Sequence, residues 1–354
     1  MAKAADKSGA EDTLYIGIDF GTSRTKISCS NGVRKVVTTA VGWPKDVIAA
    51  KFLGKNVVFG EEVLKHRMSL DVVHPLENGV IPPEEEGKKK KSRNTRTEAA
   101  KALMEHMISL SEPAGYKNVY GVLLTPAEAS LEEKQALIDV FGKNLDAILL
   151  VSAPFAVAYG MNRMENTLVV DIGGGTVDLC RIHGTLPVPE DQKTLKKAGI
   201  HIDSTLLDLV TKEFEGAQIS TNMVRLWKEE HSQVSGVRDS AKVTFPVNGS
   251  PQDSDISDQI RQACEGIVPD MVESIRELVS TFNPEFQHLL RENVLLAGGG
   301  SQIENLDNYL SDKLEIIGGA RVVAVEDPTF LGADGALRLG QDMPDTYWQR
   351  LSES

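Results

Sequence analysis

The sequence has little cysteine and no pattern of metal-binding or redox residues. Its three cysteines, Cys29, Cys180 and Cys264, are scattered and form no CxxC pair. This argues against a disulfide framework or a zinc site, fits a reducing compartment, and predicts buried apolar thiols. The seven histidines show no HExxH or other ligand spacing, so no transition-metal chemistry is expected.

Long apolar runs are also absent. The most apolar stretch, residues 147–161, is too short to span a bilayer and contains a proline. The first thirteen residues have neither the apolar core of a signal peptide nor an amphipathic stripe. We therefore interpret residues 1–13 as a flexible, solvated tail and expect a cytoplasmic protein without direct membrane insertion.

Basic residues are outnumbered by acidic ones. The 38 Lys and Arg against 51 Asp and Glu leave a formal charge of -13, which repels a phosphate backbone, so nucleic acid is not expected as a partner. At 354 residues and 41% hydrophobic content the chain can form two domains or lobes. Neither GxGxxG with a downstream acid nor GxxxxGK[ST] occurs, which disfavours Rossmann and P-loop nucleotide sites.

Two segments of the chain share one plan. Residues 13–30, TLYIGIDFGTSRTKISCS, and 166–183, NTLVVDIGGGTVDLCRIH, each place two β-rich runs around a glycine-containing turn. Superposing them aligns Asp19 with Asp171 and Gly21 with Gly173, at a separation of about 150 residues, the length of one domain. The chain is therefore predicted to be a pseudo-duplication.

The remaining sequence has a mixed α/β pattern. Amphipathic helical stretches are predicted at 97–110, 130–143 and 256–282, covering a central sheet in each half. Residues 82–93, with two prolines and a charge block, are predicted to be an exposed loop, and 248–257 a polar loop closing a smaller subdomain.

The two turns carry the residues suited to phosphate binding. In the first, the backbone of Gly21, Thr22 and Ser23 can form a nest for phosphate oxygens, and Lys26 could reach the same oxygens. In the second, Gly173, Gly174, Gly175 and Thr176 allow close backbone approach, with Asp171 and Asp178 on either side. Two such nests would grip one triphosphate, and Asp19 with Asp171 would hold hydrated Mg²⁺. Either turn alone would instead be a tight β-hairpin with glycine at positive φ.

A third glycine run follows an apolar strand at residues 293–306. Gly298, Gly299 and Gly300 could lie against a flat base, and Ser301 is predicted to cap a helix with Glu304 completing a capping box. Taken alone, this motif is equally a strand-to-helix turn.

Together these motifs resemble the actin, Hsp70 and sugar-kinase superfamily over nearly the whole chain. The resemblance implies an α/β actin-like ATPase fold with two similar lobes around a nucleotide cleft that binds ATP or ADP and Mg²⁺. It implies domain I at 14–160 plus 332–354, with a small subdomain near 42–75, and domain II at 161–331, with a small subdomain near 199–256.

The resemblance also assigns roles to residues outside the two turns. It places Gly298–Ser301 at the adenosine, Gly332–Ala336 in the second connecting helix, and Lys228 with Glu229 against base and ribose. Without the family, Lys228 and Glu229 would be an exposed helical charge pair.

Several long segments that ATP binding does not require are similar to the magnetosome-associated bacterial actins. They are residues 41–62, 74–81, 184–199 and 325–344. This resemblance implies ATP-dependent filaments of the protein itself, located in the cytoplasm, that align magnetosomes and contact magnetosome-associated proteins.

One position departs from the pattern of bacterial actins. Their first connecting segment usually has a glutamate before proline to orient the attacking water, whereas this chain has Ala153. Losing that group should slow hydrolysis and spare nucleotide binding. Asp171 or a chain of waters could instead position the nucleophile.

Two other functions are compatible with the same fold. A small-molecule kinase would use a carboxylate to deprotonate a substrate hydroxyl, but it needs a substrate site usually built by insertions that this compact chain lacks. An Hsp70-like module would need a β-rich peptide-binding domain, and none follows the second connecting segment.

Overall fold

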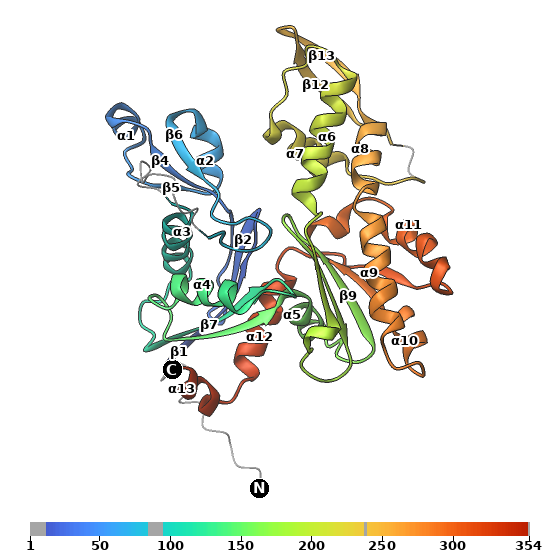
Figure 1. Ribbon diagram of the computed structural model, residues 1–354. Coiled ribbons are helices and arrows are strands. Elements are labelled where there is room, and N and C mark those ends of the chain that lie inside the picture. Colours follow the sequence, from blue (N-terminus) through green and yellow to red (C-terminus); the bar gives the residue numbers. More distant parts are fainter. Residues whose placement is uncertain (1–11, 84–94, 237–238, 353–354) are drawn as a thin grey trace. The chain divides into compact units, whose positions relative to one another are not determined.

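The computed structural model describes residues 12–83, 95–236 and 239–352 (Figure 1). Residues 1–11 of the tail predicted at 1–13, and the charged part of the predicted loop at 84–93, lie outside these ranges. The chain divides into two compact units. The first runs through Asn162 and resumes at Phe330, and the second comprises Arg163–Thr329. The units are described one at a time.

The first unit is built on a five-stranded sheet in the order β3-β2-β1-β7-β8. Its strands are β1 (Thr13–Phe20), β2 (Arg24–Cys29), β3 (Arg34–Thr38), β7 (Asn118–Thr125) and β8 (Ala147–Ser152). The first three pair antiparallel, and β7 and β8 continue the sheet parallel to β1. Because β1 begins at Thr13, the tail prediction is wrong for that residue.

The second unit repeats this arrangement, in the order β11-β10-β9-β14-β15. Its strands are β9 (Thr167–Ile172), β10 (Val177–Ile182), β11 (Gln192–Leu195), β14 (Val294–Ala297) and β15 (Val322–Ala324). Again three strands are antiparallel and two follow in parallel. The equal order and direction confirm the duplication predicted from the two hairpin sequences.

Two helices of the first unit begin at residues that cap their N-termini. Thr95 and Ser130 form capping boxes with Glu98 and Glu133, starting α3 (Arg96–Leu110) and α4 (Leu131–Phe141) close to the predicted positions. The other helices packed on this unit's sheet are α5 (Ala153–Gly160), α12 (Leu331–Asp342) and α13 (Asp345–Ser352).

A small sheet with its own core extends from the first unit (Figure 1). It contains β4 (Val41–Pro44), β5 (Val58–Phe59) and β6 (Leu70–Val73), with α1 (Val47–Leu53), α2 (Glu61–His66) and the 3₁₀ turn η2 (Arg67–Ser69). Its core residues are Ala40, Val58, Val63 and Leu70.

The second unit has one continuous core that includes its outer helices. The helices are α6 (Gly199–Glu213), α7 (Thr221–His231), α8 (Ser257–Glu265), α9 (Val268–Ser280), α10 (Gln287–Arg291) and α11 (Leu306–Lys313), with 3₁₀ turns η3 (Pro189–Asp191), η4 (Gly299–Gln302) and η5 (Leu314–Ile317). Leu206, Trp227 and Phe245 belong to the same core as the buried residues of the sheet.

Two predictions for this unit are wrong. The stretch 256–282 is two helices, because Pro269 in the first turn of α9 lacks an N–H and cannot continue α8. The polar segment 248–257 contains a strand, β13 (Ser250–Asp255), paired with β12 (Lys242–Val247). The turn between them is Asn248-Gly249, both at positive φ, which is a local hairpin signal that polarity concealed.

A buried charge network fixes the loop after β10. The Arg181 guanidinium donates to Asp191 at 2.6 Å and to the Leu278 carbonyl at 2.9 Å. Burial alone would raise the pKa of Asp191, but hydrogen bonds from Arg181, the Val188 amide and His183 together lower it. The loop is thereby tied to the end of α9.

We expect Asp191→Asn to destabilise the protein by about 3 kcal/mol at neutral pH, because Arg181 would keep a buried, uncompensated charge. Since the folded-state pKa of Asp191 is lowered, its contribution is present at neutral pH and is lost as pH falls through that pKa. Urea unfolding, measured from neutral to acid pH, should show that the difference in free energy of unfolding between variant and parent becomes smaller. Glu190→Gln, next to it and exposed, is the control, and a gap independent of pH would contradict the ion-pair argument.

The three cysteines are buried, as predicted, and burial raises the pKa of the Cys29 thiol to about 12.

Within the described ranges no helix combines the length and apolar character that crossing a membrane requires.

Candidate functional site

The first predicted phosphate turn joins β1 to β2. Asp19 lies opposite Lys26 in the register of the hairpin, and the Lys26 ammonium is 2.9 Å from the Asp19 carboxylate. The carbonyl of Gly21 accepts a hydrogen bond from Thr39, and a side chain at Gly21 would meet the Arg24 carbonyl at 2.7 Å. The turn is therefore held tightly, with a cation beside its acidic residue.

The second turn joins β9 to β10 in the same way. Here Asp171 lies opposite Asp178, and the amide of Gly173 donates to the carbonyl of Thr176 at 2.8 Å. Buried Asp178 accepts hydrogen bonds from the hydroxyls of Thr176 (2.7 Å) and Thr194 (2.6 Å). Asp178 thus positions Thr176 within the turn.

The glycines of the two turns do not adopt the left-handed backbone conformation. None of Gly21, Gly173, Gly174 and Gly175 has a positive φ. The alternative of hairpins that need glycine only for positive φ therefore does not describe these turns. What remains is close backbone approach, which is the property a phosphate nest uses.

The third glycine run lies directly beside the second turn. Strand β14 runs parallel to β9 and pairs Ala297 with Asp171. A Cβ at Gly298 would be 2.3 Å from an Asp171 carboxylate oxygen, and one at Gly300 2.2 Å from the side chain of Ile172. A Cβ at Gly299 would meet nothing within 4 Å. The run thus packs against the hairpin at two glycines and faces open space at the one between them.

The predicted helix cap at Ser301 is wrong. Gly299–Gln302 forms η4, and the α-helix α11 begins only at Leu306. The Ser301 hydroxyl donates to the carbonyl of Gly298 at 2.8 Å. Ser301 closes the glycine turn on itself, a role that sequence spacing does not distinguish from capping.

Lys228 lies next to the second turn. Its ammonium on α7 donates to the Gly199 carbonyl and pairs with buried Asp203, each at 2.8 Å. The amide of Gly199 in turn donates to the Gly173 carbonyl at 3.1 Å. Glu229 pairs with Arg225 on the same helix at 3.2 Å. Lys228 is therefore integrated into the site's framework, and its partner Asp203 was not anticipated from the sequence.

We expect Lys228→Met to cost about 3 kcal/mol of stability at neutral pH by leaving the Asp203 carboxylate buried without its cation. Burial already raises the pKa of Asp203, and Lys228 partly offsets that rise. The cost should therefore shrink as pH falls and Asp203 becomes protonated.

Urea unfolding at several pH values checks this expectation for Lys228. The double variant Lys228→Met, Asp203→Leu should recover much of the loss, and Glu229→Gln should change little. A single variant as stable as the parent at neutral pH would contradict it.

Ala153 is the first residue of α5 and directly follows β8. The register of β1, β7 and β8 places the end of β8 at the same sheet edge as Asp19, two strands away, or about 10 Å. Ser152, at the N-cap, makes no side-chain capping bond. A longer polar side chain at 153 would therefore start from the edge that carries the first phosphate turn.

The small residues of Gly332–Ala336 pack α12 against the first unit's sheet. A Cβ at Gly335 would be 1.9 Å from the Ala156 carbonyl of α5, and one at Gly17 of β1 would be 2.0 Å from the Ala333 carbonyl. The structure thus gives this motif a packing role within the first unit.

The predicted residues gather into one group in each unit. In the first unit they are Asp19, Gly21, Thr22, Ser23, Lys26 and Ala153, and in the second Asp171, Gly173–Thr176, Asp178, Lys228 and Gly298–Ser301. No cluster of three His, Cys, Asp or Glu suited to a metal occurs in the described part of the chain.

Comparison with known proteins identifies the family. The model of the MreB/Mbl protein family matches residues 13–346. The chain belongs to this family. It is 38% identical over 344 residues to the "Actin-like protein MamK" of Magnetospirillum gryphiswaldense, covering 97% of this chain and 93% of that relative.

Solved structures agree with this membership. A structure titled "MamK double helical filament" matches with a TM-score of 0.88 and 38% identity, over 94% of this chain and all of that one. A non-polymerising MamK mutant bound to AMPPNP matches with a TM-score of 0.70 and 37% identity, over 94% of this chain and all of that one. The actin-like fold and the resemblance to bacterial actins are confirmed.

Proposed function

We propose that this protein is a polymerising actin-like ATPase that binds ATP with Mg²⁺ and forms cytoplasmic filaments that position magnetosomes. The observation that carries the nucleotide part is the grouping in the second unit. There the Gly173–Thr176 turn, the Gly298–Gly300 run and Lys228 lie together at the carboxyl ends of β9 and β14. Ligands of α/β sheets bind at such edges.

The residues fit a nucleotide in chemical terms. The two turns offer backbone amides and the hydroxyls of Thr22 and Ser23 to phosphate oxygens. A Cβ at Gly299 would meet nothing within 4 Å, so a flat base could lie against this glycine. The relative that binds AMPPNP at 37% identity supports an adenine nucleotide as the ligand.

Magnesium would be held by few protein groups. Asp19 and Asp171 are hard oxygen donors, and Mg²⁺ commonly keeps several waters while binding one or two carboxylates. The bound ion would neutralise charge on the phosphates. Lys26, paired with Asp19 at 2.9 Å, would hold that carboxylate in a fixed orientation.

Hydrolysis is proposed to be slow, since Ala153 offers no polar group to orient water at the start of α5. Asp171 is the remaining candidate to position the nucleophile. Filaments of such an enzyme should persist after assembly.

Assembly is supported by the relatives rather than by a surface of this chain. The matching structure of the MamK filament is a polymer of a protein 38% identical to this one. Head-to-tail contacts that do not close generate open filaments. This favours self-association over a small-molecule kinase. Magnetosome-associated proteins are proposed as further partners by analogy with the magnetosome-associated bacterial actins that the chain resembles.

Negative-stain microscopy with pelleting, in ATP-Mg²⁺, ADP or no nucleotide, tests the proposal, with phosphate release followed in the same samples. Filaments that form with ATP and outlast slow phosphate release are expected. No polymer with any nucleotide, together with ADP formation stimulated by a hydroxyl-bearing substrate, would favour the kinase instead.

A further inference from the structure

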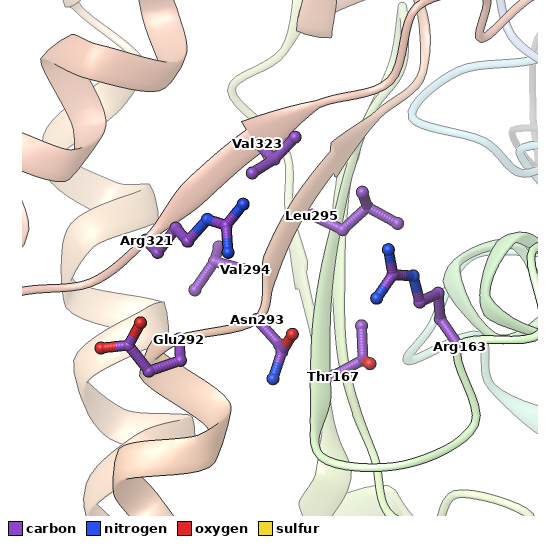
Figure 2. Close-up of a pocket in the computed structure, with 8 residues that line it drawn as sticks. All are labelled: Arg163, Thr167, Glu292, Asn293, Val294, Leu295, Arg321 and Val323. Carbon is purple, nitrogen blue, oxygen red and sulfur yellow. The ribbon is translucent and has the colours of Figure 1, made fainter.

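A cavity of about 120 Å³ opens in the second unit at the sheet edge opposite the glycine turns (Figure 2). It lies where β9, β14 and β15 begin, whereas the nucleotide residues lie where β9 and β14 end. Its lining comprises Arg163, Thr167, Glu292, Asn293, Val294, Leu295, Arg321 and Val323.

The sheet register arranges this lining in two rows. Val294 pairs with Leu168 and Val322, so the preceding residues Thr167, Asn293 and Arg321 form a polar row across the three strands. Two residues further along, Leu295 and Val323 form an apolar row on the same face. The cavity thus has a polar rim beside an apolar wall.

Two guanidinium groups supply the positive charge of the cavity. Neither Arg163 nor Arg321 forms an ion pair within the described chain. In Figure 2 the guanidinium of Arg321 lies beside Val294 and that of Arg163 points toward Leu295. The carboxylate of Glu292 points away from both. Two arginines without acidic partners in a chain of charge -13 form a local site for an anion.

The other polar groups do not compete for this role. The Asn293 amide donates to the Leu289 carbonyl at 3.0 Å, and the Thr167 hydroxyl donates to the Glu165 carbonyl at 3.0 Å. The Thr167 hydrogen and one of the two Asn293 amide hydrogens are thus engaged in the fold. The two guanidiniums are the charged side-chain donors that the cavity offers to a ligand.

Volume and polarity limit what can enter. A cavity of about 120 Å³ corresponds to roughly four water molecules, which is far too small for a nucleotide. The apolar row of Leu295 and Val323 favours methylene groups over a bare inorganic ion. We propose that this cavity binds a short aliphatic carboxylate, either as a free acid or as a glutamate side chain on a peptide.

Methyl NMR on the full chain, kept in its ADP-Mg²⁺ form so that the nucleotide site does not respond, tests this proposal independently of polymerisation. Titration with glutarate is expected to shift the methyl signals of Leu295 and Val323, with an affinity in the millimolar range. The peptide acetyl-Glu-amide is the second probe. Tighter binding of the peptide would identify a protein-borne carboxylate, and tighter binding of glutarate a free acid.

Substitutions identify the groups responsible. Arg163→Gln and Arg321→Gln should each weaken glutarate binding by about tenfold. Arg276→Gln, on the exposed surface of α9 in the same unit, should leave it unchanged. Because Arg163 and Arg321 are exposed, the variants should fold, and unaltered methyl spectra away from the cavity would verify this.

Three outcomes would overturn the proposal. The first is the absence of shifts at Leu295 and Val323 with either probe. The second is that glutarate binds the double variant Arg163→Gln, Arg321→Gln as tightly as it binds the parent, or that the uncharged glutaramide binds the parent as tightly as glutarate does. The third is tighter binding of inorganic phosphate than of glutarate, because the apolar row would then have no part in recognition.

Discussion

Replacing Ala153 with glutamate is expected to raise the rate of phosphate release by about a hundredfold, the usual contribution of a positioned acid–base group. Residue 153 begins α5 at the sheet edge where β1 presents Asp19. A carboxylate there can orient a water, and its negative charge suits a helix N-terminus, so the substitution should not impair folding. Filaments of the variant should disassemble sooner after ATP is consumed.

Phosphate release and ADP affinity, measured together, check the effect of Ala153→Glu. Affinity for ADP should stay within about twofold of the parent, because the group acts on water rather than on the nucleotide. Ala153→Gln is the control that can orient water but cannot accept its proton, and it should give an intermediate rate. A rate unchanged by glutamate would show that Asp171 or a water chain already does this work.

Substituting Gly298 by alanine is expected to be among the most damaging single changes to the second unit. Gly298 has φ 73° and ψ 171°, a region that only glycine occupies readily. The added Cβ would be 2.3 Å from the Asp171 carboxylate and 2.5 Å from the Ile172 carbonyl. Strain and overpacking together should cost about 2–5 kcal/mol.

The neighbouring glycine provides a matched control for Gly298→Ala. A Cβ at Gly299 meets nothing within 4 Å, so Gly299→Ala should change stability by less than about 0.5 kcal/mol. Urea unfolding measures both variants. Nucleotide binding to any folded Gly298→Ala protein should also be weakened at least about tenfold, because Asp171 would be displaced. Equal behaviour of the two variants would refute the packing argument.

The two hairpins could be predicted because their signals are local. Alternating apolar residues around a glycine-containing turn specify a hairpin within about twenty residues, and their recurrence at Asp19 and Asp171 revealed the duplication. The helices after Thr95 and Ser130 were also predictable, since a capping residue lies beside an amphipathic run. Asn248-Gly249 was an equally local signal that polar composition hid.

The sequence by itself therefore determined the α/β class and the repeated hairpins with their glycine-containing turns. Only the tertiary structure decided that Asp178 binds Thr194, that Lys228 pairs with Asp203, and that Arg163 and Arg321 share one cavity. These partners lie 16, 25 and 158 residues apart in the chain. Such contacts depend on strand order and helix packing, and local periodicity carries no information about either.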